Sequence, residues 1–324
     1  MDQFSDTRLL VKIASLYYEQ GLNQSDIATR LDLSQSFVSR AIKRCHAEGL
    51  VRVSVTHPTG TYVTLENELQ ARYGVEQVII VHVDEDAPDR SIKRAIGSAA
   101  ASHLQNRLDG DELIGLSSWS SFIAAMVDQM HPQSSRARGV IQILGGVGHN
   151  DSLQANMLTN DLARLLQCRA HLLPTKSFGR DSRDKRTQLE IEELADVVTL
   201  FPDVELAIVG IGTNEPSELV RKAGIFDSEE NGTDLAALGA VGDICLHYYD
   251  RDGEPVLDER DDPVISMTLS QLKACPTVIA LAGGLHKVEA IGGALAGGYL
   301  DVLITDCVTA AALAERHPVE PPRA

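Results

Sequence analysis

Four short segments of the sequence carry groups that could bind a small polar molecule. Each follows an apolar run of strand length, and each is rich in glycine, serine or a charged side chain. The segments are GLSSWSSF at 115–122, GGVG at 145–148, GAVGD at 239–243 and AGGLHK at 282–287. Backbone N–H groups and hydroxyls at the start of a helix favour an anion. The pattern therefore predicts a binding site for an anionic or hydroxyl-rich ligand.

The first two segments offer hydroxyls and backbone N–H groups. The candidate contacts are Ser117, Ser120, Ser121, Gly145, Gly146 and Val147. Serine-rich helix starts are common, so helix capping is the alternative role for the serines. The glycine segment could let the backbone approach a ligand closely. It lacks the full dinucleotide fingerprint, so we predict no nicotinamide site and no other cofactor.

The last two segments supply charge. Asp243 follows two glycines, and a carboxylate can accept hydrogen bonds from vicinal hydroxyls; capping of a turn is an equally good local interpretation. Lys287 follows Gly283 and Gly284 at the expected start of a helix, where a cation could anchor a phosphate. The sequence thus predicts a hydroxyl acceptor and a phosphate anchor.

The first sixty residues have the pattern of a DNA-binding helix-turn-helix. Apolar residues at helical spacing precede Gly21, and a second helix over 27–31 is followed by a third that Ser34 can cap. The third helix would bury Val38, Ile42 and Cys45, leaving a polar and basic face for the major groove. The predicted DNA contacts are Gln24, Ser34, Gln35, Ser36, Ser39, Arg40, Lys43 and Arg44. The segment 48–55 resembles the short strand that follows such a motif.

The charge of the chain is divided unevenly. The net charge is -17. Residues 1–60 hold seven of the 29 Lys and Arg residues and six of the 46 Asp and Glu residues, a balance of +1; the rest, with 22 against 40, carries -18. The acidic remainder of the chain should repel the DNA backbone. We therefore expect the basic face of the N-terminal segment to bind double-stranded operator DNA.

The remaining sequence alternates apolar runs with helical stretches. The expected strands lie at 78–83, 112–117, 140–144, 204–212, 277–284 and 302–306. Runs of this kind without polar alternation suit parallel strands covered on both faces. We predict an α/β protein: an all-α helix-turn-helix domain plus a large doubly wound parallel sheet that binds its ligand beyond the strand carboxyl ends.

Length and composition set the domain plan and the compartment. We predict a DNA-binding domain at 1–57, a linker helix at 58–74 and an effector-binding and oligomerisation domain at 75–318. The five cysteines form no CxxC pair, so neither disulfides nor a metal site is expected. The sequence shows no membrane span, and its acidic start argues against a signal peptide, so we expect a cytoplasmic protein without membrane partners.

In these motifs the sequence resembles the SorC family of sugar-binding transcriptional regulators over nearly its whole length. The resemblance is carried by QSDIATRLDLSQSFVSRAIKRCHAEGLVRV, VIQILGGVG, LGAVGDICLHYYDRDGEPV and IALAGGLHKVEAIGGALAGGYLDVLITD. It implies a winged-helix-like DNA-binding domain and an effector domain similar to sugar-phosphate isomerases and glucosamine-phosphate deaminases. Members act as dimers or tetramers on sugar, polyol or sugar-phosphate operons.

The resemblance also assigns residues and shows two departures, the serine segment described below and LLPTKSF at 172–178, where relatives carry a more apolar segment and where Lys176 could reach the ligand or lie in solvent. Asp243 matches a position that contacts effector hydroxyls, Lys287 matches a phosphate contact, and Asp306 of LITD would line the same crevice. Relatives carry a stretch like GLSWGRTL where this chain has GLSSWSSF. The missing glycine and threonine leave two effector classes open, a sugar phosphate and an unphosphorylated sugar or polyol.

A different class of function is a sugar-phosphate isomerase or deaminase fused to a DNA-binding segment. Isomerisation needs a positioned base. Asp243 could serve, but no His or Glu motif accompanies it in the strand-end loops, and His149, His247 and His286 are assigned to loops or packing. The sequence therefore predicts a DNA-binding regulator rather than an enzyme.

Overall fold

The computed structural model describes residues 3–51, 60–132, 137–146, 152–175, 177, 179, 181–214, 235 and 237–316. The chain divides into two compact units, Met1–Pro58 and Thr59–Ala324, each described here by itself.

The N-terminal unit is a three-helix helix-turn-helix. Its helices are α1 (Gln3–Tyr18), α2 (Gln24–Leu31) and α3 (Gln35–Ala47). Asn23 caps α2 by accepting a hydrogen bond from Asp26 N, and Ser34 caps α3 by accepting one from Phe37 N, as its type predicts. Apolar side chains from all three helices form one core, with Ile13, Ile27, Val38 and Cys45 fully buried. Most of the strand expected at 48–55 lies outside the described residues.

The larger unit is built on one sheet of seven parallel strands. Their order across the sheet is β1-β10-β9-β5-β2-β3-β4. The strands are β1 (Gln77–Val81), β2 (Leu113–Leu116), β3 (Gly139–Gln142), β4 (Arg169–His171), β5 (Leu206–Gly210), β9 (Val278–Leu281) and β10 (Val302–Asp306). The six strands predicted from apolar runs are confirmed, as is the α/β fold class. The short edge strand β4 was not foreseen.

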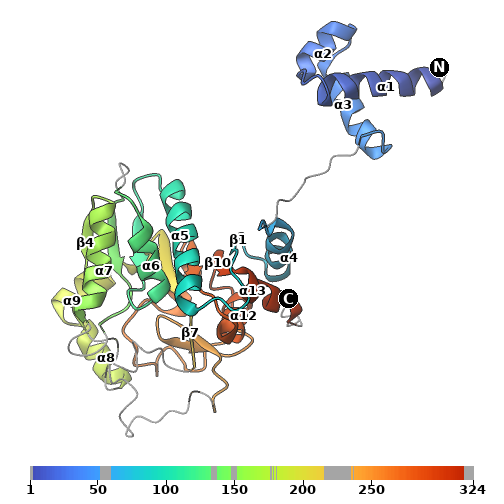
Figure 1. Cartoon of the computed structure of the whole chain (residues 1–324). Coiled ribbons are helices and arrows are strands. Elements are labelled where there is room, and N and C mark those ends of the chain that lie inside the picture. The colour runs from blue at the N-terminus through green and yellow to red at the C-terminus, as the bar shows by residue number, and fades with distance from the viewer. Residues whose placement is uncertain are drawn as a thin grey trace. The chain divides into compact units, whose positions relative to one another are not determined.

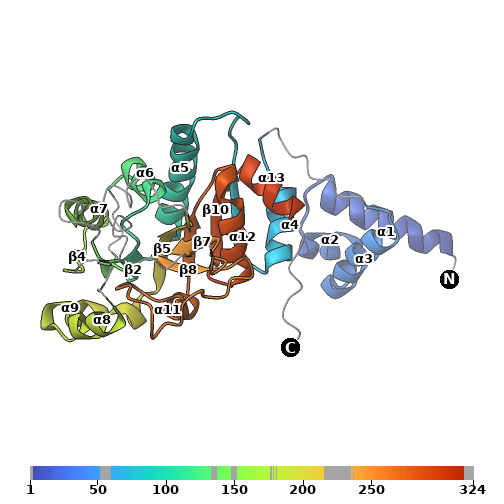
Figure 2. The same cartoon turned by 90° about the horizontal axis from the view of Figure 1, so that it is seen from below.

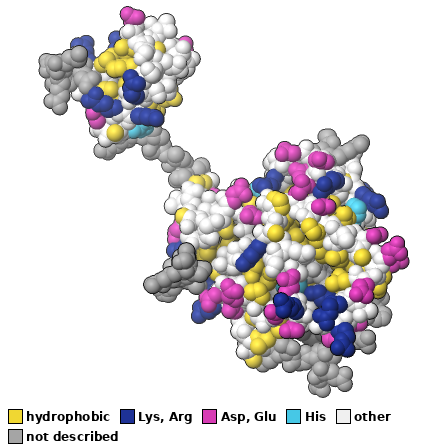
Figure 3. Space-filling model, turned by 180° about the vertical axis from the view of Figure 1, so that it is seen from behind, with side chains coloured by type: hydrophobic (Ala, Val, Ile, Leu, Met, Phe, Trp, Pro, Cys, Tyr) yellow, Lys and Arg dark blue, Asp and Glu magenta, His cyan; other side chains and the backbone are white. Residues whose placement is uncertain are grey.

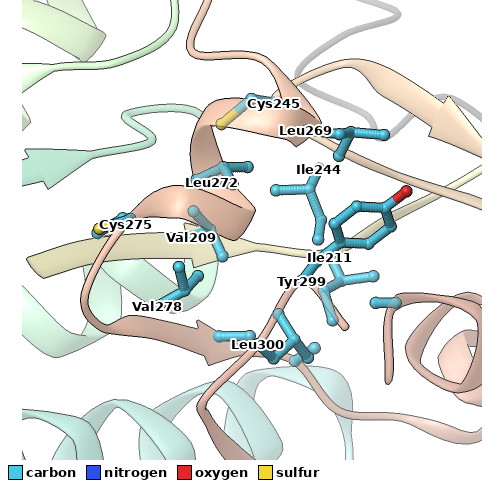
Figure 4. Packing of buried hydrophobic residues seen from close by; sticks show 14 of the residues in the cluster. Val209, Ile211, Ile244, Cys245, Leu269, Leu272, Cys275, Val278, Tyr299 and Leu300 are labelled. Carbon is cyan, nitrogen blue, oxygen red and sulfur yellow. The ribbon is translucent and has the colours of Figure 1, made fainter. Parts of the chain in front are cut away.

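Helices cover both faces of this sheet (Figures 1 and 2). They are α4 (Val63–Tyr73), α5 (Asp89–Arg107), α6 (Ser121–Gln129), α7 (Ser152–Leu165), α8 (Ser182–Leu189), α9 (Glu192–Val198), α11 (Leu269–Ala274), α12 (Val288–Ala296) and α13 (Cys307–Glu315), with 3-10 turns η1 (Phe201–Asp203) and η3 (Leu285–Lys287). One apolar core joins α5, α6 and α7 to one face, and a second joins α4, α9, α11, α12 and α13 to the other. Figure 4 shows part of the second core.

A small antiparallel sheet follows the carboxyl end of β5. It consists of β6 (Gly212–Thr213), β7 (Gly242–Ile244) and β8 (His247–Tyr249). The turn from β7 to β8 passes through Cys245 and Leu246, both with positive φ (53° and 68°). Left-handed backbone costs a residue with a side chain of the order of 1–2 kcal/mol, so neighbouring bonds must hold this turn.

Helix α4 lies along β1, the edge strand of the sheet. Leu69 is fully buried in the core of the larger unit. Two side chains on the same helix face satisfy edge N–H groups: Glu66 Oε1 accepts from Ile80 N at 2.9 Å, and Gln70 Oε1 accepts from Val78 N at 3.1 Å. An uncovered edge strand invites pairing with other chains. The helix predicted as a linker is thus packed on the effector-binding unit.

Helix α13 is held at both ends. Asp306 caps its start by accepting hydrogen bonds from Val308 N and Thr309 N. At its end, the Arg72 guanidinium of α4 donates to the carbonyls of Ala314 and Arg316. The last carbonyls of a helix have no N–H partner within the helix, so Arg72 supplies the hydrogen-bond donors for these two. Within the described ranges, no helix has the length and apolarity needed to cross a membrane.

Candidate effector site and DNA-recognition helix

The predicted effector residues gather where the strand order of the large sheet diverges. β2 and β5 are neighbours, but the chain proceeds from β2 toward β3 and β4 and from β5 toward β9 and β10. In doubly wound sheets, ligands bind beyond the carboxyl ends of strands at such a point. The segments after β2, β5 and β9 supply the serines, Gly212 and Lys287.

Asp243 is a buried carboxylate whose two oxygens have different surroundings. Its Oδ2 accepts a hydrogen bond from Leu246 N at 2.9 Å, so the turn-capping interpretation holds for that oxygen. Its Oδ1 has no hydrogen-bond partner among the described residues and lies against Gly212, where a side chain would overlap it. Burial raises the pKa of Asp243 to about 6, against the opposing effects of the Leu246 N–H group and the charges of Lys287 and His247.

Lys287 is half-buried above an aromatic ring. Its Nζ donates to the carbonyl of Ile211, just after β5, and stands 5.5 Å from the centroid of the Phe122 ring. Burial lowers the pKa of Lys287, while the carboxylate of Asp243 raises it. Lys93 of α5 stands 6.0 Å from the same ring centroid and pairs with Asp89. Sequence reasoning missed Lys93 because its relation to Lys287 is purely spatial.

The serine segment turns tightly at the start of α6. Ser117 N donates to Ile208 O on β5 at 3.0 Å, and the Ser117 side chain lowers the pKa of the Cys245 thiol against the larger effect of burial. Ser120 caps α6 through Ile123 N and abuts Gly210 at the end of β5. Ser121 is the half-buried first residue of the helix. The segment therefore connects the ends of β2 and β5 with the turn that carries Asp243.

The glycine segment after β3 is tied to its neighbours through backbone atoms. Gly145 O accepts from Trp119 Nε1 at 2.9 Å and from Ser177 Oγ at 2.6 Å. Gly146 N donates to Thr175 O at 2.8 Å. These bonds hold the segment beside the serine loop, with both carbonyls engaged. The predicted contact Val147 lies outside the described residues, as does His149.

Asp306 lies under the loop that carries Lys287. Besides capping α13, its Oδ2 accepts from Gly284 N and from the Thr309 hydroxyl, at 2.8 and 2.6 Å. Gly284 has a φ of 96°, and a side chain at Gly283 would overlap the Asp306 carboxylate. Both carboxylate oxygens are thus used within the protein. This geometry favours a positioning role for Asp306, and its predicted contact with the effector stays a prediction.

Three buried polar side chains behind the Asp243 turn were not foreseen as a group. His247 Nδ1 lies 2.5 Å from Asp262 Oδ2, and His247 Nε2 lies 2.7 Å from Ser266 Oγ. All three are less than a tenth exposed. His247 had been assigned to loop or packing, since nothing in the sequence couples it to residues 15 and 19 positions further on.

The recognition helix α3 presents the predicted DNA contacts on one open side. Gln35, Ser36, Arg40 and Lys43 are exposed, while Ser39 is half-buried. Arg44 is exposed but forms an ion pair of 2.5 Å with Glu48. Exposed Ser34 accepts the capping bond, and Gln24 begins α2 half-buried. Figure 3 shows Lys and Arg side chains on one face of this unit, and many acidic side chains on the larger unit.

Metal and thiol chemistry find little support in the described ranges. No group there of three or more His, Cys, Asp or Glu side chains could hold a metal ion. The five cysteines are free thiols. Burial raises the pKa of Cys245, the thiol nearest the site, to about 12. This thiol is therefore neutral at ordinary pH and acts as a packing and hydrogen-bonding group.

Comparison with known proteins identifies both units. A family model described as "Putative sugar-binding domain" matches residues 57–315, and a MarR family model matches residues 13–59. The chain is 29% identical to the sorbitol operon regulator of Klebsiella pneumoniae over 314 residues, 96% of this chain and 98% of that protein.

Two solved structures are similar as well. The full-length sorbitol operon regulator SorC from K. pneumoniae has a TM-score of 0.71 at 28% identity, covering 96% of this chain and all of that one. The sugar-binding domain of the transcriptional regulator DeoR from Pseudomonas syringae pv. tomato has a TM-score of 0.63 at 45% identity, covering 79% of this chain and all of that domain.

Fold, site and comparisons together define a transcriptional regulator in which a helix-turn-helix unit is joined to a sugar-binding α/β domain. The chain belongs to the SorC family of sugar-binding transcriptional regulators, and the resemblance seen in its sequence is confirmed.

Proposed function

We propose that this regulator controls a carbohydrate or polyol operon in response to a small effector bound at the carboxyl ends of β2, β5 and β9. Its relatives include a regulator named for the sorbitol operon and one named for deoxyribonucleosides, which supports an effector of the sugar, polyol or sugar-phosphate class. The observation that carries the proposal is the buried Asp243 carboxylate. Its Oδ1 is left without a partner among the described residues, and it is close enough to Lys287 for the two charges to affect each other.

The two charged groups suit different parts of such an effector. An ionised carboxylate accepts hydrogen bonds, so Asp243 Oδ1 fits sugar hydroxyls. Lys287 is held in place by Ile211 O and the Phe122 ring, and its remaining N–H groups could bind a phosphate or a further hydroxyl. Ser117, Ser120, Ser121, Gly145, Gly146, Gly283 and Gly284 frame the same region and remain proposed contacts.

The DNA contacts are proposed for α3. Gln35 and Ser36 at its exposed start would meet base edges, while Arg40 and Lys43 further along would meet phosphates. Arg44 would contribute less because Glu48 already pairs with it. Gln24, Ser34 and Ser39 are proposed as flanking contacts to the DNA backbone.

We propose that the sugar-binding domain binds its effector without converting it. The relatives are transcriptional regulators, and the imidazole of His247, the histidine coupled electrostatically to Asp243, is enclosed between Asp262 and Ser266. His247 is buried, and its two ring nitrogens lie against protein groups, so the imidazole is not presented to a bound effector. We further propose that the protein is cytoplasmic and assembles as a dimer or tetramer, as the family resemblance implies.

A thermal-shift screen of the purified full chain against sugars, polyols and their phosphates tests the effector proposal. A compound that binds the folded state raises its melting temperature. We expect stabilisation by at least one compound class, and loss of that stabilisation in Lys287→Ala if the compound is a phosphate ester. Lys273→Ala, which removes an exposed lysine of α11, is the matched control.

The outcomes separate the open alternatives. Stabilisation by neutral sugars or polyols that is unaffected by Lys287→Ala would assign the unphosphorylated class. Stabilisation by no compound of either kind would contradict the effector proposal. Consumption of the stabilising compound during prolonged incubation would instead support the enzyme alternative.

A further inference from the structure

The three side chains Asp262, His247 and Ser266 form a buried relay next to the effector site, and the proposed function does not use them. Asp262 Oδ1 accepts from Val264 N at 2.9 Å, and its Oδ2 contacts His247 Nδ1. His247 Nε2 contacts Ser266 Oγ, which in turn lies 3.0 Å from the carbonyl of Cys245. The relay therefore ends on the left-handed turn that follows Asp243.

Asp, His and Ser are the residue types of a serine hydrolase triad, but here the serine hydroxyl is not accessible to a substrate. A nucleophilic serine needs a free hydroxyl facing substrate and donors for the developing oxyanion. Ser266 is 7% exposed, and its hydroxyl lies within hydrogen-bond distance of a protein carbonyl. The geometry thus argues for a structural task rather than acyl transfer.

The turn that the relay reaches is one that needs support. Cys245 and Leu246 both adopt positive φ without being glycine. Two side chains hold this turn in addition to the pairing of Ile244 with His247: Ser266 Oγ donates to Cys245 O, and Asp243 Oδ2 accepts from Leu246 N. Loss of one bond would let the turn open and would move the Asp243 carboxylate.

We propose that His247, clamped between Asp262 and Ser266, is the positioning residue that holds the Cys245–Leu246 turn and thereby aims Asp243 at the effector. The inference rests on the function proposed above for Asp243. It extends that function by assigning a support that contacts neither effector nor DNA.

Counting protons shows why the histidine matters. The Ser266 hydroxyl has one hydrogen, which it can donate either to His247 Nε2 or to Cys245 O. When the imidazole is doubly protonated, Nε2 donates to Ser266 and the hydroxyl is free to donate to Cys245 O. When Nε2 is bare, the two acceptors compete. The turn is therefore held more firmly in the protonated state of His247.

The charged groups around His247 come from three elements. Asp262 contacts it from the loop before Val264, Asp243 acts on it electrostatically from β7, and Lys185 of α8 lies behind Asp262, donating to its carbonyl at 3.1 Å. Asp243 also accepts the Leu246 N–H bond, so the same carboxylate contacts the turn and acts on the imidazole.

Hydrogen exchange at the Leu246 amide tests the inference without an effector. In the full chain, Ser266→Ala should raise the exchange rate of this amide about fivefold, because a hydrogen bond that contributes about 1 kcal/mol is lost from the turn. Ser266→Thr, which keeps the hydroxyl, should restore slow exchange. Ser270→Ala, which removes an exposed hydroxyl bonded to Glu259, is the control and should change nothing.

A second variant separates positioning by the histidine from the hydroxyl of Ser266 itself. His247→Gln leaves Ser266 in place but removes the imidazole that lies 2.7 Å from its Oγ. We expect His247→Gln to raise the exchange rate of the Leu246 amide in the same direction as Ser266→Ala. His247→Gln is also the second variant should Ser266→Ala fail to fold.

Unchanged Leu246 exchange in both Ser266→Ala and His247→Gln would overturn the inference. These results are independent of the effector screen. If the screen finds no effector while the turn responds as expected, the proposed function fails and the support of the turn stands.

Discussion

At the scale of single residues, the site combines groups whose environments oppose their charged forms. Asp243 is buried with a raised pKa, and Lys287 is half-buried with a lowered one. Buried charges cost stability unless they are fully compensated. Charged side chains in such surroundings are common at functional sites, which supports the effector contacts proposed for Asp243 and Lys287.

Because the buried Asp243 carboxylate lowers the stability of the fold, replacing it with a neutral amide in Asp243→Asn should stabilise the protein at high pH. The folded-state pKa of about 6 exceeds the usual 3.8, so the folded protein holds this proton more tightly than the unfolded chain. The stabilising contribution is complete below pH 3.8 and is lost as pH rises through about 6. At pH 8 we expect Asn to raise the free energy of unfolding by up to about 3 kcal/mol, a gain that disappears near pH 4.

Urea unfolding followed by the fluorescence of Trp119 measures this effect on the larger unit, because the chain has a single tryptophan. Asp128→Asn, on an exposed position of α6, is the control. The same Asp243 variant should lose its response to effector. A variant less stable than the parent at pH 8 would show that the Asp243 carboxylate is better compensated than its surroundings indicate.

The residue types of the site could be predicted from the sequence, but their partners could not. Glycine, serine, Asp243 and Lys287 stand out because each follows an apolar strand. The Asp262–His247–Ser266 relay joins through space the first residue of β8 and two residues outside the named strands, and no spacing rule connects them. For the same reason Asp306 could be placed at a strand end, while the commitment of both its oxygens to Gly284 and α13 could not.

At the scale of elements, strands buried on both faces were the most predictable part. Continuous Val and Ile runs identify β1, β2, β3, β5, β9 and β10 because helices cover each face. The strands β6, β7 and β8 have two or three residues each, too few for a periodic pattern, and their turn uses Cys245 and Leu246 where glycine would have signalled it.

The contact between α4 and α13 predicts the effect of Arg72→Ala. The guanidinium donates to two carbonyls at the end of α13, and its side chain is 23% exposed. Hydrogen bonds from a charged donor contribute about 1.5–3 kcal/mol, so we expect the larger unit to lose about 2 kcal/mol of unfolding free energy.

Trp119 fluorescence in urea checks this loss as well. Arg164→Ala removes an exposed guanidinium paired only with Asp161 over one helical turn, and it should cost less than 0.5 kcal/mol. Equal effects of the two substitutions would mean that the α13 carbonyls are hydrated rather than held by Arg72.

At the scale of the whole molecule, the division of charge assigns the DNA contact to one unit. The N-terminal sixty residues carry +1 and the rest carries -18, so the larger unit as a whole repels the DNA backbone and the helix-turn-helix unit does not. This division supports the contacts proposed for the cations of α3.

A salt series on DNA tests this division. We expect Arg40→Ala and Lys43→Ala each to lower the slope of log affinity against log salt by about 1, and Arg44→Ala to lower it less because of Glu48. Gln35→Ala should instead reduce discrimination between sequences. Fluorescence anisotropy with a duplex obtained by in vitro selection measures both, and equal slopes for parent and variants would exclude α3 from phosphate contact.

The pairing of β1 with β10 governs the order in which a growing chain can fold. Gln77 pairs with Val302, so β1 cannot take its place in the sheet until the ribosome has added a further 225 residues. The helix-turn-helix needs only local contacts and is complete long before. During synthesis there is thus an interval in which a DNA-binding unit exists without its sensor, and a prematurely terminated chain would stay in that condition permanently.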